Sequence, residues 1–258
     1  MLSYLRTISV IYLKRLANAL PLWQQKQYTK FVLLGRGRSG TTLLHTYLNS
    51  HPNVLSLGEL MHPRHQHPLR HQNPIRYLQQ YGFKNYSPLI KAVGFKMFYE
   101  WESGNVQHPL WQTLHQIPDL KVIHLRRENK LRNLVSYKIA RQSRQWSQEP
   151  GQKQVAAQAK AVTLTKEECI AVFEKMTAEE VFFDRFFKNH SKINLTFEEL
   201  TAQPNQVLQQ VQEFIGVKPM QLVSLLQRQN PEPLQQLIIN YDELKEQFRD
   251  SEWFRYFD

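Results

Sequence analysis

The strongest structural signal in this chain of 258 residues is the segment FVLLGRGRSGTTLLHTYLNSHPNV, residues 31–54. It begins with apolar residues typical of a buried strand, continues through a turn with two arginines flanked by glycines, and ends in an amphipathic helical pattern. A strand, a glycine-rich turn and a helix N-terminus often bind phosphate or sulfate oxygens together. The segment therefore predicts an α/β fold with an anion-binding turn near residue 40.

The turn carries several kinds of hydrogen-bond donor. We expect the backbone N–H groups from Ser39 to Thr42 to face the anion, and Gly40 to let the backbone approach it closely. Thr41 and Thr42 add hydroxyl groups, and Arg38 adds a planar cation that matches phosphate or sulfate oxygens. The alternative is an ordinary strand-to-helix turn, which rarely concentrates so many donors.

The rest of the chain alternates short apolar runs with helical patterns, which indicates a parallel sheet with crossover helices. The predicted strands are residues 31–34, 54–57, 92–98, 121–125 and 193–197. We therefore expect one α/β domain over residues 30–258, with a central parallel sheet of about five strands flanked by helices. Residues 1–29 are expected to form a separate amphipathic helical segment before it.

A long helix is predicted between the last two strands. Thr165 followed by Glu168 has the form of a capping box, and the helix is expected to run toward His190. Its aromatic and aliphatic residues are expected to face the core; they are Ile170, Phe173, Phe182, Phe183, Phe186 and Phe187.

The composition indicates an anionic partner. The chain has 33 Lys and Arg against 22 Asp and Glu, a net charge of +11. Most of the excess lies in residues 1–70, where nine basic residues face one acid, Glu59. The segment 1–29 is expected either to pack on the domain or to make peripheral contact with an anionic membrane. The only cysteine, Cys169, allows no disulfide within the chain, so a cytoplasmic location is expected.

Two other functions are compatible with such a basic chain. A P-loop kinase or NTPase would share the spacing of Gly35 and Gly40, but Thr41 stands where that motif has lysine, and none of the predicted strands ends in Asp. Metal-assisted phosphoryl transfer is therefore disfavoured. A nucleic-acid-binding protein is also disfavoured, because the chain has neither zinc-finger spacing nor an aromatic-basic ribonucleoprotein signature.

Residues 38–42 read RSGTT, the form of the 5′-phosphosulfate loop in sulfotransferases that use 3′-phosphoadenosine 5′-phosphosulfate (PAPS). The following LLHTYLNSHPNVLSLGEL resembles the bacterial carbohydrate branch of that family, which includes nodulation-factor and trehalose sulfotransferases. The similarity extends over roughly residues 30–217. It implies transfer of a sulfuryl group from PAPS to a hydroxyl of a carbohydrate or glycolipid, with adenosine 3′,5′-bisphosphate (PAP) as the product and no metal.

The resemblance also implies roles for single residues. Arg38 and the residues up to Thr42 would bind the phosphosulfate and stabilise the leaving oxygen. Glu59 would be the catalytic base, the alternative being a structural ion pair with a loop arginine. Arg127 and Ser136, in KVIHLRRENKLRNLVSYKIA, would bind the 3′-phosphate. The alternative there is a solvated helix with exposed basic residues.

Three segments have no assigned role. In the histidine-rich run 62–71, contact with sugar hydroxyl groups is favoured over a metal site. The glutamine-rich segment 142–164 resembles a lid, and the aromatic C-terminal tail could pack on its own domain, on a second subunit or on a membrane. Lys96, on a predicted strand, is left outside the site.

Overall fold

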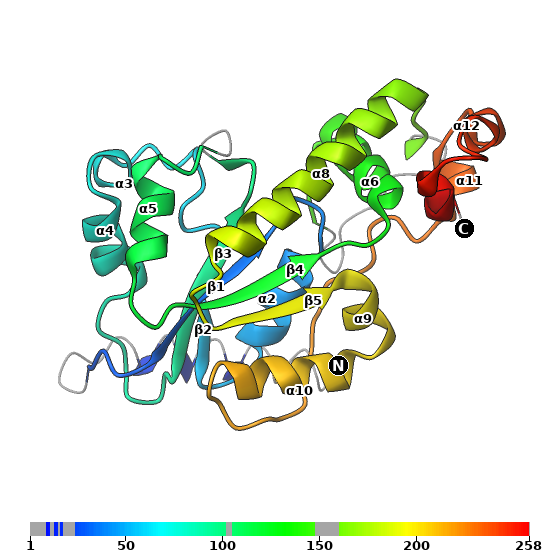
Figure 1. Ribbon diagram of the computed structural model, residues 1–258. Coiled ribbons are helices and arrows are strands. Elements are labelled where there is room, and N and C mark those ends of the chain that lie inside the picture. Colours follow the sequence, from blue (N-terminus) through cyan, green and yellow to red (C-terminus); the bar gives the residue numbers. More distant parts are fainter. Residues whose placement is uncertain are drawn as a thin grey trace. The chain divides into compact units, whose positions relative to one another are not determined.

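The computed structural model describes residues 9–10, 13–14, 16–17, 24–101, 105–147 and 160–257 (Figure 1). The chain divides into two compact units. The first comprises Met1–Arg126 and Phe183–Ser224, and the second comprises Arg127–Phe182 and Leu225–Asp258. The predicted boundary between residues 29 and 30 is not one of these divisions, and it stays a prediction.

The first unit contains a five-stranded sheet in which every pair of neighbours is parallel. Its strands are β1 (Thr29–Gly35), β2 (Val54–Ser56), β3 (Ala92–Phe98), β4 (Lys121–Arg126) and β5 (Lys192–Thr196), in the order β2-β3-β1-β4-β5. The predicted α/β fold is thus confirmed. The predicted end of the last strand is wrong by one residue, because Thr196 caps a helix that begins at Phe197.

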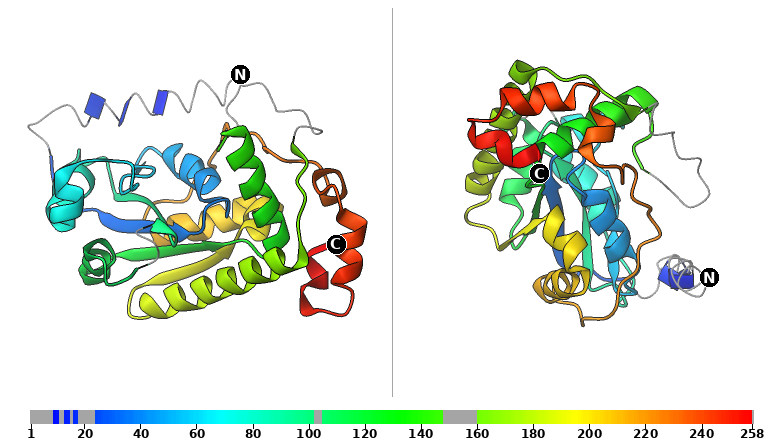
Figure 2. Two further views of the ribbon diagram at one scale, coloured as in Figure 1. Left: turned by 90° about the horizontal axis from the view of Figure 1, so that it is seen from above. Right: turned by 90° about the vertical axis from the view of Figure 1, so that its right-hand side faces the viewer.

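Helices lie against both faces of this sheet (Figures 1 and 2). They are α2 (Thr41–Asn49), α3 (Pro68–Gln72), α4 (Pro74–Tyr77), the π-helix η2 (Leu78–Gly82), α5 (Pro109–Gln116), α9 (Phe197–Ala202) and α10 (Pro204–Phe214). Alternate residues of β1 point to opposite faces of the sheet. Val32 and Leu34 pack in the core that includes α4, η2 and α5. Phe31 and Leu33 pack in the core that includes α2, α9 and α10. Burial on both faces explains why β1 is a continuous apolar run.

The second unit is helical. Its elements are α6 (Lys130–Ser143), α11 (Leu234–Leu237), α12 (Tyr241–Gln247), the 3-10 helix η4 (Glu252–Phe257) and most of α8 (Lys166–Phe186). Tyr256 and Phe257 are buried in its core, so the aromatic tail packs on its own unit. Residues 148–159, in the middle of the glutamine-rich segment, lie outside the described residues.

The helix predicted after Thr165 is confirmed as α8, and the Glu168 amide donates to the Thr165 hydroxyl at 3.2 Å. Phe173, Phe183 and Phe187 are buried as expected. The prediction is wrong at Phe182, whose residue surface is 45% exposed. Successive helical residues are turned by about 100° from each other, so Phe182 and Phe183 cannot share one face.

Residues 9–10, 13–14 and 16–17 of the N-terminal segment are helical, and the usual pattern of buried apolar and exposed charged residues is reversed at three of them. Leu13 and Leu16 are exposed, whereas Lys14 is buried. The Lys14 ammonium donates to the carbonyl oxygens of Asn49 at 2.7 Å and Val54 at 2.8 Å, and burial lowers its pKa to about 8. Among the described residues, no helix combines the length and apolar character needed to cross a membrane.

Candidate functional site

The predicted anion-binding turn lies where β1 ends and α2 begins. Its last residue, Gly40, is the N-cap of α2 and has a φ of 95°. A Cβ atom there would lie 2.4 Å from Cδ2 of Phe197, so both the backbone conformation and the space require glycine. Arg38 also has a positive φ, of 70°, a strain that proteins often keep at binding sites.

Ser39 gives the most direct indication of a ligand. The residue is 1% exposed, and its hydroxyl oxygen has no hydrogen-bond partner among the described residues. A buried hydroxyl without a partner costs about 1–3 kcal/mol, so such groups are uncommon away from functional sites. The first N–H groups of α2 also have no partner within the helix, since that is true of every helix N-terminus. This end of the loop can therefore donate several hydrogen bonds to an oxyanion.

Arg38 adds a partly desolvated cation to the same loop. Burial lowers the pKa of its guanidinium to about 10, which still leaves it charged at neutral pH. Thr41 is buried and Thr42 is half-buried at the first two positions of α2. The structure thus places Arg38, Ser39 and Gly40 in the turn and Thr41 and Thr42 at the start of α2, at the predicted junction of strand and helix.

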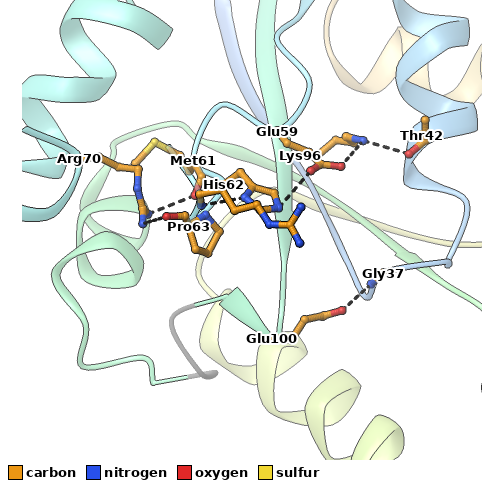
Figure 3. Close-up of polar contacts among 10 residues, drawn as sticks. Gly37, Thr42, Glu59, Met61, His62, Pro63, Arg70, Lys96 and Glu100 are labelled. Carbon is orange, nitrogen blue, oxygen red and sulfur yellow. Dashed lines mark hydrogen bonds and ion pairs between the residues drawn. The ribbon is translucent and has the colours of Figure 1, made fainter. Parts of the chain in front are cut away.

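Lys96 connects this turn to Glu59 (Figure 3). Its ammonium lies 3.0 Å from the Thr42 hydroxyl oxygen and 3.0 Å from Glu59 Oε1. Burial lowers the pKa of Lys96, and the Glu59 carboxylate partly opposes this. The ion pair that was the alternative for Glu59 therefore exists, but its cation is Lys96 on β3. The signal in the sequence was a lysine inside the otherwise apolar run Ala92–Phe98.

Glu100 is a second residue that sequence reasoning missed. Its Oε1 accepts the Gly37 N–H at 2.9 Å (Figure 3). The amide of the preceding residue, Tyr99, donates to the Gly35 carbonyl at 3.0 Å. The two residues that follow β3 therefore bind the loop backbone at Gly35 and at Gly37. The pairing of β1 with β3 brings these residues together, and this register cannot be read from the sequence.

The histidine-rich run forms a folded loop next to Glu59. Arg70, which is fully buried, donates to the carbonyl oxygens of Met61 and Pro63 and thereby closes the loop on itself (Figure 3). His62 lies with Nε2 3.8 Å from Glu59 Oε2, and His67 caps α3. Among the described residues, no group of three or more His, Cys, Asp or Glu side chains is arranged to hold a metal ion.

Arg127 and Ser136 belong to the second unit. Arg127 follows directly after β4, and Ser136 is buried on α6 with its hydroxyl 3.4 Å from the side-chain amide nitrogen of Asn230. The alternative of a solvated basic helix is wrong for two of its residues. Lys130 is buried and pairs with Glu180 at 2.7 Å, and Arg132 donates to backbone carbonyls of the segment 230–232.

Comparison with known proteins identifies relatives along most of the chain. The family model of the sulfotransferase domain matches residues 28–247. Nodulation protein H of Rhizobium meliloti strain 1021 is 32% identical over 247 residues, which cover 88% of this chain and 94% of that protein. Nodulation protein H of Rhizobium tropici is 29% identical over 242 residues, which cover 88% and 92%. A solved sulfotransferase from Alicyclobacillus acidocaldarius has a similar fold, with a TM-score of 0.50 at 17% identity over 88% of this chain and 93% of that one.

Proposed function

The chain belongs to the sulfotransferase domain family and, on that basis, we propose that it transfers a sulfuryl group from PAPS to a hydroxyl group of a carbohydrate or glycolipid. The observation that carries this proposal is the RSGTT turn, in which the buried Ser39 hydroxyl has no partner among the described residues. Oxygens of a phosphosulfate match the donors of that turn in charge and geometry.

Bound PAPS would supply the sulfuryl group, whose bond to the 5′-phosphate oxygen breaks as a bond to the acceptor oxygen forms. Negative charge then grows on the phosphate oxygen. Arg38, the hydroxyl groups of Ser39 and Thr42, and the amides at the start of α2 are donors that can stabilise this charge without rearranging. Lys96 adds positive charge beside Thr42.

Glu59 is the base in this proposal, because an acceptor hydroxyl must lose a proton as it attacks. Its side chain is 37% exposed, so an acceptor can reach it, and Lys96 holds one of its carboxylate oxygens toward the turn. Arg127 and Ser136 are proposed to bind the 3′-phosphate, as the family resemblance implies. The similarity to nodulation protein H favours a carbohydrate-type acceptor.

The donor can be tested by calorimetry with PAP against ATP, in the presence and absence of magnesium. We expect submicromolar binding of PAP and at least tenfold weaker binding of ATP. Arg38→Ala and Arg127→Ala should each weaken PAP binding by about tenfold or more, since each removes a charge-assisted contact. Arg76→Ala, which removes an exposed arginine on α4, is the control and should bind PAP normally. Preference for magnesium-ATP would instead indicate a kinase or NTPase.

The base can be tested separately. Glu59→Gln should lower turnover by about 100-fold while PAP affinity is unchanged, because the amide keeps the shape of the side chain and loses its basicity. Wild-type turnover in this variant would remove Glu59 from the mechanism.

Peripheral membrane contact through residues 1–29 remains part of the proposal, as does a cytoplasmic location. The membrane contact is supported by the exposed Leu13 and Leu16 and by the absence of acidic residues before Glu59 in the sequence. Cosedimentation with anionic vesicles, compared with neutral ones, tests it, and Leu13→Ser/Leu16→Ser should weaken any binding.

A further inference from the structure

Glu59 and His62 lie on one short turn. The His62 amide donates to the Glu59 carbonyl at 2.9 Å, which brings the two side chains to the same side of the loop. The loop is rigid here because the buried Arg70 guanidinium holds the carbonyls of Met61 and Pro63, the residues on either side of His62. Figure 3 shows His62 between this guanidinium and the Glu59 carboxylate.

The hydrogen bonds of the His62 ring assign its tautomer. Nδ1 accepts the Arg64 N–H at 2.9 Å, so in the neutral ring the proton is on Nε2. This N–H faces Glu59 Oε2, 3.8 Å away. The ring also packs edge-on against Trp101, with centroids 5.4 Å apart, and Trp101 is buried.

We propose that His62 is a positioning residue that orients the Glu59 carboxylate from the side opposite to Lys96, an inference that rests on the proposed base role of Glu59. The Lys96 ammonium lies 3.0 Å from Oε1 and the His62 N–H faces Oε2 from 3.8 Å away, so each carboxylate oxygen has a positively polarised group beside it. The remaining lone pairs are left for the acceptor hydroxyl.

Taking up the transferred proton would cost His62 its hydrogen bond from the Arg64 amide. In the neutral ring Nε2 is already protonated and Nδ1 accepts the Arg64 amide. The Glu59 carboxylate is partly exposed and can instead release the proton that it takes up directly to solvent.

The arrangement also predicts a pH dependence. Burial lowers the pKa of His62, the Glu59 carboxylate raises it, and the nearby charges of Arg64, His65 and Arg70 lower it. At neutral pH the ring is uncharged and turns its Nε2–H toward Glu59 Oε2 across 3.8 Å, which is longer than a hydrogen bond. Protonation in acid would add a second cation beside Glu59 and weaken it as a base.

The first test is NMR of the full-length chain with ¹⁵N-labelled histidine. We expect the Nε2–H tautomer for His62 at pH 7.5, with a pKa below its ordinary value. In Glu59→Gln the pKa of His62 should fall further, because the opposing negative charge is gone. An Nδ1–H tautomer, or the same pKa in both proteins, would overturn the proposal.

The second test is kinetic, with PAPS as the donor and trehalose as the acceptor probe. His62→Ala should lower kcat by about tenfold with the KM for PAPS unchanged, and His62→Gln, which keeps an N–H donor, should recover most of that loss. The acidic inflection belonging to His62 should be absent from the pH profile of His62→Gln. Arg76→Ala, which removes an exposed arginine on α4 outside this loop, is the control and should keep wild-type kcat.

A double variant separates this inference from the proposed function. In the Glu59→Gln background, His62→Ala should have no further effect on kcat, because His62 acts only through Glu59. Equal effects of His62→Ala in both backgrounds, or no rescue by His62→Gln, would refute the positioning role while leaving the base intact. If the wild-type chain does not bind PAP, the proposed function itself is refuted.

Discussion

Gly40→Ala tests whether the anion-binding turn depends on glycine, as its geometry requires. An L-residue in the left-handed region costs about 1–2 kcal/mol, and this applies at a φ of 95°. The new Cβ would also lie 2.4 Å from Phe197 Cδ2, far inside the contact distance of about 3.5–4.0 Å. Such overpacking typically costs about 1–3 kcal/mol. The two effects together should lower the free energy of unfolding by about 2–5 kcal/mol.

The assay is urea-induced unfolding, with midpoints compared at equal slope. Gly216→Ala is the control for backbone strain alone: its φ is 75°, and its Cβ would lie 3.5 Å from the nearest atom, an ordinary contact. It should cost only about 1–2 kcal/mol. Combining Gly40→Ala with Phe197→Ala should cost less than the sum of the two single changes, because the contact is removed. Equal losses for the Gly40 and Gly216 variants would refute the close approach of α9 to the turn.

Three further predictions concern buried polar groups. Lys160→Met should lower the free energy of unfolding by about 3–5 kcal/mol, because it leaves Glu232 without the ammonium that now lies 2.9 Å away. Urea unfolding measures this loss, and replacing Glu232 by leucine in the same protein should recover part of it. His124 is fully buried with a pKa lowered to about 4, so the native chain resists protonation that the unfolded chain accepts below about pH 6.5. The stability that His124 contributes should be complete above pH 6.5 and fall by about 3 kcal/mol toward pH 4, so the free energy of unfolding of His124→Gln should decline by about that much less than that of the wild type over this range. Burial raises the pKa of the Cys169 thiol to about 12. The native protein should therefore react with iodoacetamide about 100-fold more slowly than the urea-unfolded protein. Rapid modification of the thiol without urea would contradict its burial.

Much of the fold was predictable because it depends on local patterns. Strands buried on both faces read as continuous apolar runs, and the run at Ala92–Phe98 has the predicted limits. The turn at residues 38–42 was also predictable, since glycine and hydroxyl-bearing residues at a strand-to-helix junction have a direct physical meaning.

The remaining features depend on contacts between segments that are distant in the sequence. Lys96 and Glu100 reach the turn only because β3 pairs with β1, and nothing near either residue in the sequence reports that pairing. The loop that carries Glu59 and His62 is closed by the buried Arg70, whose partners are backbone carbonyls and therefore leave no pattern of residue types. The burial of Lys14 has the same cause, since it binds carbonyls near residues 49–54.

The order of the strands has a consequence for synthesis on the ribosome. β1 and β3 can pair as soon as both have emerged, and β4 then adds beside β1. The outer edge of β4 keeps its hydrogen-bonding groups uncovered until residues 192–196 have been made, because β5 is its neighbour. An open apolar strand edge invites association with other chains. A nascent chain that stalls between Arg126 and Lys192 would therefore be the species most in need of a chaperone.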